Sequence, residues 1–178
     1  GQNAVDFVAT GTLASGQTVA LKTDGTVEAV AASAASAGSI VVFNAETFSP
    51  SLAYDPTNNK VVLAYCDSGN NNYGTAVVGT VSGTSISFGT EVVFNTGNLD
   101  AISTTYDSTN NKIVIGYTDK GNSNYGTAIV GTVSGTSISF GSEVVFNSAL
   151  SFYISVAYDS TNNKAVFAYY DGGGSSGA

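Results

Sequence analysis

Short runs of apolar residues alternate with small polar segments along most of this chain. In the middle of the chain four such runs occur in succession, at 102–107, 112–119, 125–133 and 137–147. Each run is rich in β-branched and aromatic residues, and Gly, Asn, Ser and Asp fill the segments between them, which is typical of strands joined by tight turns. The pattern predicts a four-stranded antiparallel unit whose last strand is long enough to bend at Gly141.

The same unit recurs about every 52 residues. The stretches AYDPTNNK, TYDSTNNK and AYDSTNNK occupy 53–60, 105–112 and 157–164, and YGTA occurs at 73–76 and 125–128. Repeats of this length with four short strands are what a β-propeller requires, because each blade buries its apolar surface against its neighbours.

The second run of each unit is apolar on both of its faces. In KVVLAYCD (60–67), apolar residues occupy the odd and the even positions alike. A strand that is apolar on both faces lies between two layers. We therefore predict an all-β protein with four-stranded antiparallel blades of a partial β-propeller; a β-solenoid or a trimeric fibre repeat is the alternative.

The chain divides into an N-terminal β-module with an Ala/Ser linker (1–36) and a repeat array (37–178). Within the array the strands of successive units fall at 40–95, 96–147 and 148–178, and the last unit is incomplete. In the N-terminal module, TDGT predicts a hairpin with an Asp-Gly turn. The array holds about two and three-quarter units, whereas propellers close with four to eight blades. We therefore expect further repeats or further chains to complete the ring.

The composition argues against several functions. Five Lys and Arg residues stand against thirteen acids, giving a net charge of −8, and the chain has no His and a single Cys. An acidic chain is poorly suited to bind nucleic-acid phosphates, and no apolar run is long enough for membrane insertion. His-based catalytic triads and the usual zinc sites are excluded. We expect a non-enzymatic protein with no cofactor and no metal.

Three recurring acids have a structural explanation. Asp55, Asp107 and Asp159 each precede the TNNK motif of a repeat. An Asx-type turn, in which the carboxylate accepts hydrogen bonds from the main chain just ahead, accounts for their recurrence without a catalytic role. Cys66 is replaced by Thr or Tyr in the other repeats, which is typical of a packing position.

The repeat has a resemblance among viral proteins. SPSLAYDPTNNKVVLAYCDSGNNNYGTAVVGTVSGTSISFGTEVVF and its second copy resemble repeats of tail-fibre and other virion surface proteins of marine bacteriophages, and GTLASGQTVALKTDGTVEAV is similar to a segment just upstream of such repeats. The resemblance implies a tail fibre, head fibre or decoration component on the virion surface or otherwise extracellular. It implies other virion proteins, and a host glycan or host protein, as partners. Analogy with phage fibres implies a homo-oligomer, with a trimer favoured.

Two other functions remain open from the sequence. One is a secreted or surface lectin-like carbohydrate-binding module of bacterial origin, and the other is a polysaccharide depolymerase on a propeller scaffold. Among these, the virion protein is the leading interpretation.

Two segments vary between otherwise matching repeats. One joins the fourth run to the next first run, at 45–50, 96–101 and 148–153; the other joins the second run to the third, at 68–72, 120–124 and 172–176. Connections in a meander alternate between its two ends, so we expect both variable segments at one end, where binding residues concentrate. The candidate ligand-binding residues are Phe48, Asp67, Asn70, Asn72, Asp119, Asn122, Asn124, Phe152 and Tyr153.

Overall fold

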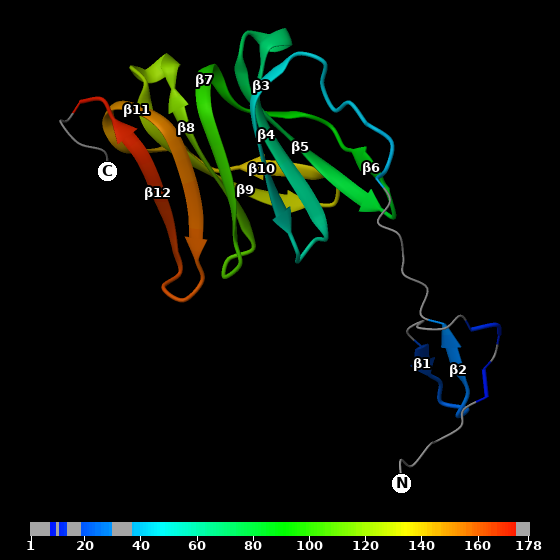
Figure 1. Ribbon diagram of the computed structural model, residues 1–178. Coiled ribbons are helices and arrows are strands. Elements are labelled where there is room, and N and C mark those ends of the chain that lie inside the picture. The colour runs from blue at the N-terminus through cyan, green and yellow to red at the C-terminus, as the bar shows by residue number, and fades with distance from the viewer. Residues whose placement is uncertain (1–7, 10, 14–18, 30–36, 174–178) are drawn as a thin grey trace. The chain divides into compact units, whose positions relative to one another are not determined.

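The protein folds as two separate compact units, Gly1–Ala37 and Gly38–Ala178. The computed structural model (Figure 1) describes residues 8–9, 11–13, 19–29 and 37–173. The described elements are strands, apart from two short 3₁₀ helices in the larger unit. The all-β class predicted from the sequence is confirmed.

The smaller unit contains a hairpin of two short strands. Strands β1 (Val19–Leu21) and β2 (Val27–Ala29) pair antiparallel. Between them, Gly25 adopts a left-handed φ of 81°, and the Asp24 carboxylate accepts a hydrogen bond of 2.9 Å from the main-chain N–H of Thr26. The predicted Asp-Gly turn is confirmed, because only Gly takes this backbone conformation without a steric cost.

The larger unit is a ten-stranded antiparallel sheet that curls into a half-barrel (Figure 1). The strand order is β12-β11-β9-β8-β7-β5-β4-β3, and β6 and β10 pair with β5 and β9. In chain order its elements are β3 (Thr47–Asp55), β4 (Lys60–Asp67), η1 (Ser68–Asn70), β5 (Tyr73–Ser82), β6 (Ser85–Phe88), β7 (Val92–Asp107), β8 (Lys112–Asp119), η2 (Lys120–Asn122), β9 (Tyr125–Ser134), β10 (Ser137–Phe140), β11 (Val144–Asp159) and β12 (Lys164–Asp171).

Two long strands run across the repeat boundaries. The first part of β7 pairs with β5 and its second part pairs with β8; β11 likewise pairs first with β9 and then with β12. The sequence predicted loops at 96–101 and 148–153, and this was wrong. The backbone instead stays extended through a bulge, at which Ala101 adopts a left-handed φ of 48° and the pairing register shifts. A bulge bends a strand without ending its pairing.

The sheet follows the sequence repeat. Within this larger part of the chain, we call residues 47–98, 99–150 and 151–173 repeat units one, two and three, and from here on a numbered unit is one of these repeats. Even-numbered residues of β4, β8 and β12 form the forward face of each unit, and odd-numbered residues form the backward face, because side chains alternate along a strand. The forward face of each unit packs against the backward face of the next.

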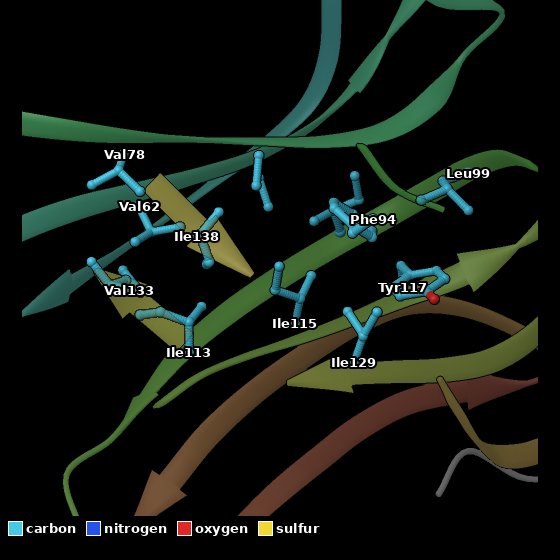
Figure 2. Packing of buried hydrophobic residues seen from close by; sticks show 14 of the residues in the cluster. Val62, Val78, Phe94, Leu99, Ile113, Ile115, Tyr117, Ile129, Val133 and Ile138 are labelled. Carbon is cyan, nitrogen blue, oxygen red and sulfur yellow. The ribbon is translucent and has the colours of Figure 1, made fainter. Parts of the chain in front are cut away.

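The core lies between units one and two, as Figure 2 shows. Val62 and Val78 of unit one cluster with Ile113, Ile115 and Ile138 of unit two, and none of these side chains is more than 3% exposed. A fully buried aliphatic side chain of this size contributes about 1.5–3 kcal/mol. Every residue of β8 after its first is buried, which confirms the prediction of a strand with two apolar faces.

An aromatic residue at the end of each fourth run joins one unit to the next. Phe94 packs on Tyr117 and Phe140 of unit two, with ring centroids 5.5 and 5.4 Å away. Its ring also covers Gly74, where a Cβ would lie 2.6 Å from it. The Gly of YGTA therefore makes room for the aromatic ring of the following strand.

The DxTNNK turns are built as the sequence predicts. Asp55 accepts hydrogen bonds from the main-chain N–H of Asn58 (3.0 Å) and from its side-chain amide (2.8 Å). The same two bonds recur between Asp107 and Asn110. The following Asn of each turn is left-handed, at Asn59, Asn111 and Asn163. The Asx-turn interpretation is confirmed for these acids.

Candidate functional site

In units one and two, the two variable segments lie at the same end of the sheet, whereas residues 174–176 of the last unit's second variable segment lie outside the described residues. Thr47, at the start of β3, pairs with Asp67, at the end of β4, and the Ser68 N–H donates to the Glu46 carbonyl at 2.8 Å. The invariant turns between β3 and β4 and between β5 and β6 lie at the opposite ends of these strands. The strand pairing thus brings the sequence differences between repeats to one end.

The bulges of the three units border a hollow at this end. Ser49, Ala101 and Tyr153 occupy the same position in successive repeats, and each has a left-handed φ, between 48° and 53°. The hollow has a volume of about 410 Å³. Its lining includes Ser49, Asp100, Ile102, Phe152, Tyr153 and Ile154.

The hollow combines an apolar floor with an aromatic rim. Ile102 and Ile154 are 8% and 7% exposed and lie at equivalent positions of units two and three. Phe152 is half-buried and stacks on Tyr170 with ring centroids 6.4 Å apart. Tyr153 is 85% exposed although its backbone is left-handed. A left-handed conformation is costly for a bulky residue, and burial does not offset that cost here.

A carboxylate completes the lining. Asp100 accepts hydrogen bonds from the Ser49 hydroxyl (3.1 Å) and the Ala101 N–H (2.8 Å), and it pairs with the Lys120 ammonium at 3.0 Å. Burial acts to raise the pKa of Asp100, but the bonds from Lys120, Ala101 and Ser49 together hold that pKa below its usual value. The side chain is therefore a charged acceptor at neutral pH.

A second, polar hollow of about 460 Å³ lies where units one and two adjoin. The Asn95 amide donates to Asp119 (3.3 Å) and Glu143 (2.7 Å), and the Tyr117 hydroxyl also donates to Glu143 at 2.7 Å. Burial, followed by repulsion from Glu143, raises the pKa of Asp119 despite the bonds it accepts. These carboxylates already have protein donors, and the described residues contain no group of three or more His, Cys, Asp or Glu arranged to hold a metal ion.

The predicted site residues divide between these hollows and structural positions. Phe152 and Tyr153 line the first hollow, and Asp119 and Asn122 line the second. Phe48 instead packs against the core opposite Cys66. Phe48, which the sequence predicted as a ligand-binding residue, therefore has a packing role in the fold.

The remaining predicted residues shape the loop between the second and third strands. Asp67 is 6% exposed and caps η1 by accepting a bond of 3.0 Å from the Gly69 N–H. Asn70 ends η1, and Asn72 and Asn124 have left-handed φ angles of 60° and 58°. Neither hollow has any of these four residues in its lining.

Asp100 is the charged residue of the first hollow's lining, and the sequence analysis did not predict it. It lies within the variable segment TGNLDA, at the position where the other repeats carry Phe48 and Phe152. The sequence could have identified Asp100, because it is a charged residue at a position that is aromatic in the other repeats.

Comparisons with protein-family models and with curated proteins find no match for this chain. In the part of the chain that the structure describes, no helix has the length and apolar character needed to cross a bilayer. The geometry of the hollows and the repeat pattern are therefore the basis for the function.

Proposed function

We propose that this protein is a non-enzymatic virion surface component of a bacteriophage, and that it recognises a host-surface glycan through the first hollow. The observation that carries the proposal is Tyr153, an exposed aromatic residue held in a left-handed bulge beside an ionised carboxylate. The same left-handed bulge occurs at Ser49 and Ala101, so strand pairing accounts for the backbone, but at Tyr153 it carries a bulky, exposed aromatic side chain. Such strained residues cluster at ligand-binding sites, which supports a binding role for Tyr153.

The lining is chemically suited to a sugar. A pyranose ring offers a C–H face that packs on an aromatic ring, and hydroxyl groups that donate to carboxylates. The rings of Phe152 and Tyr153 supply the first kind of contact, and Asp100 supplies the second. Lys120, on the same carboxylate, adds a donor for a ring oxygen or an acidic substituent.

The proposal includes a propeller architecture for the repeats. Strand β5 pairs with β6 and with the first part of β7, so unit one contains a three-stranded meander and a broken fourth strand. Unit two repeats this arrangement, with β9 pairing to β10 and the first part of β11. Four-stranded units packed face to face support blades, and loops at one end of the blades would then carry recognition.

Binding is favoured over cleavage by the number of acids in the first hollow. Hydrolysis of a glycosidic bond generally requires two carboxyl groups about 5–10 Å apart. Asp100 is the one carboxylate among the described residues of this lining, and Lys120 and Ser49 already engage it. A depolymerase is therefore the weaker alternative.

The test is binding of the purified chain to a panel of bacterial surface polysaccharides. We expect at least one polysaccharide to be retained, and Tyr153→Ala and Asp100→Asn each to weaken its binding at least about tenfold, which is about 1.4 kcal/mol. Val81→Ala, at a residue 51% exposed beside the turn at the opposite end, is the matched control and should bind normally. Failure to bind any polysaccharide, or undiminished binding by both site variants, would overturn the proposal.

A further inference from the structure

The contact between units is made twice by equivalent residues. The Thr104 N–H of unit two donates to the Ser51 hydroxyl of unit one at 2.9 Å. The Val156 N–H of unit three donates to the Ser103 hydroxyl of unit two at 3.0 Å. The same main-chain to serine bond therefore joins each unit to the one before it.

A second bond recurs at the invariant turns. The Thr57 hydroxyl donates to the Asn111 side-chain oxygen at 3.0 Å, and the Thr109 hydroxyl donates to that of Asn163 at 2.6 Å. Each bond links a forward position in one unit to a backward position in the next. The interface between units is thus a repeated, specific surface.

The residues for a third contact of this kind are also present, but one half of them lies in unit three and the other half lies in unit one. Ser155 and Thr161, in unit three, occupy the positions of Ser103 and Thr109. Leu52 and Asn59, in unit one, occupy the positions of Thr104 and Asn111. The forward half lies at one edge of the sheet, on β11 and in the turn between β11 and β12, and the backward half lies on and next to β3, at the other edge.

The side chains on these two faces are more exposed than their equivalents in the other units, as expected for faces that no neighbouring unit covers. On the forward face, Val62 and Val114 are 0% and 7% exposed, but the equivalent Val166 is 54% exposed. On the backward face, Val156 is 8% exposed, whereas the equivalent Leu52 is 56% exposed. Each open face is therefore apolar at the positions that are covered elsewhere in the array.

We propose that a second copy of this chain docks head to tail, with the forward face of unit three in one copy on the backward face of unit one in the other. The occupant follows from continuity with the existing interface, since one chain carries both complementary halves. The Ser155 hydroxyl then accepts from the Leu52 N–H of the second copy, and Thr161 donates to Asn59. Different surfaces meet, so the contact is heterologous.

The charge distribution permits this contact. The strand segments that carry the exposed residues of the two faces are VFAYY (166–170) and SLAY (51–54), and neither contains a charged residue. The net charge of −8 is therefore carried by side chains outside these segments. This inference does not depend on glycan binding, because neither face needs the first hollow to be occupied.

Sedimentation analysis of the 178-residue chain tests the inference. At roughly 0.15 M salt and roughly 100 µM protein, we expect the wild type to sediment above the 17.9 kDa monomer. Val166→Lys and Leu52→Lys each place a charge on one face and should weaken association at least about tenfold. Both residues are more than half exposed, so folding is expected to survive. Val145→Lys is the control and should associate normally, because Val145 is 42% exposed but lies in unit two, outside both open faces.

Mixing the two variants distinguishes a heterologous contact from a symmetric one. Val166→Lys retains an intact backward face and Leu52→Lys retains an intact forward face. An equimolar mixture should therefore form a 1:1 dimer that does not grow, although each variant alone is monomeric. A monomeric wild type, variants that associate like the wild type, or a mixture that stays monomeric would each overturn the proposal.

Discussion

At the scale of single residues, the Asp of each DxTNNK turn differs between repeats most clearly in burial, although Asp107 and Asp159 also accept a bond from the main-chain N–H of the Thr two residues ahead. Asp55 is 1% exposed, whereas Asp159 is only half-buried, and both accept two bonds from the Asn three residues ahead. Asp55→Ala leaves two partly buried donors of Asn58 without their acceptor, and we expect it to lower the free energy of unfolding by about 1–3 kcal/mol.

Asp159→Ala should cost less, because water reaches the donors of Asn162 once the carboxylate is gone. Urea denaturation of the two variants beside the wild type measures both losses. Equal losses would mean that burial does not control the contribution of this turn.

The candidate site could be predicted from the sequence only in part. The differences between repeats pointed to Phe152 and Tyr153, which line the first hollow, and equally to Phe48, which packs against the core. Composition does not distinguish these aromatic residues. Their orientation depends on the bulge and on the neighbouring unit, and both of these are set by pairing between distant segments. Asp100 was missed for the same reason.

At the scale of elements, the local pattern of apolar and polar residues was sufficient to predict most strands. Strand β8 has the bounds expected from its apolar run, Lys112–Asp119, and the predicted bend at Gly141 is the break between β10 and β11. The continuity of β7 and β11 was not predictable. Their bulges follow from simultaneous pairing with two partners, whereas the local sequence contains the polar and small residues of a loop.

The bulge in β7 stores strain that a single substitution should release. Ala101 has a left-handed φ of 48°, which costs about 1–2 kcal/mol for a residue with a Cβ. Glycine removes this cost but adds entropy to the unfolded chain, so we expect Ala101→Gly to raise the free energy of unfolding by about 0.5–1 kcal/mol. Ala128→Gly, within the regular part of β9, is the control and should lower it by about 0.5–1 kcal/mol. Thermal unfolding of both variants makes the comparison, and a loss of stability in each would argue against strain at the bulge.

At the scale of the whole molecule, stability depends on how many faces of a unit are covered. Unit two lies between two neighbours, and its strand β8 is buried along nearly its full length. Unit three has one neighbour, and the residues of β12 alternate between exposed and half-buried. In repeat proteins the stability of a unit is approximately its own contribution plus that of its interfaces. The edges of the sheet should therefore open more readily than its middle.

Hydrogen exchange of backbone amides measures this difference in stability between the middle of the sheet and its edges. At protein concentrations low enough to keep the chain monomeric, we expect the amides of β8 to exchange slowest and those of β12 to exchange at least about tenfold faster. Head-to-tail docking covers β12 in one copy and β3 in the other, so protection of both edge strands should rise with concentration. Val166→Lys should abolish that rise while leaving β8 unchanged, because only its forward face is altered. Equal protection of β12 and β8 in the monomer would show that the units do not depend on their neighbours, and the open faces would then need no partner.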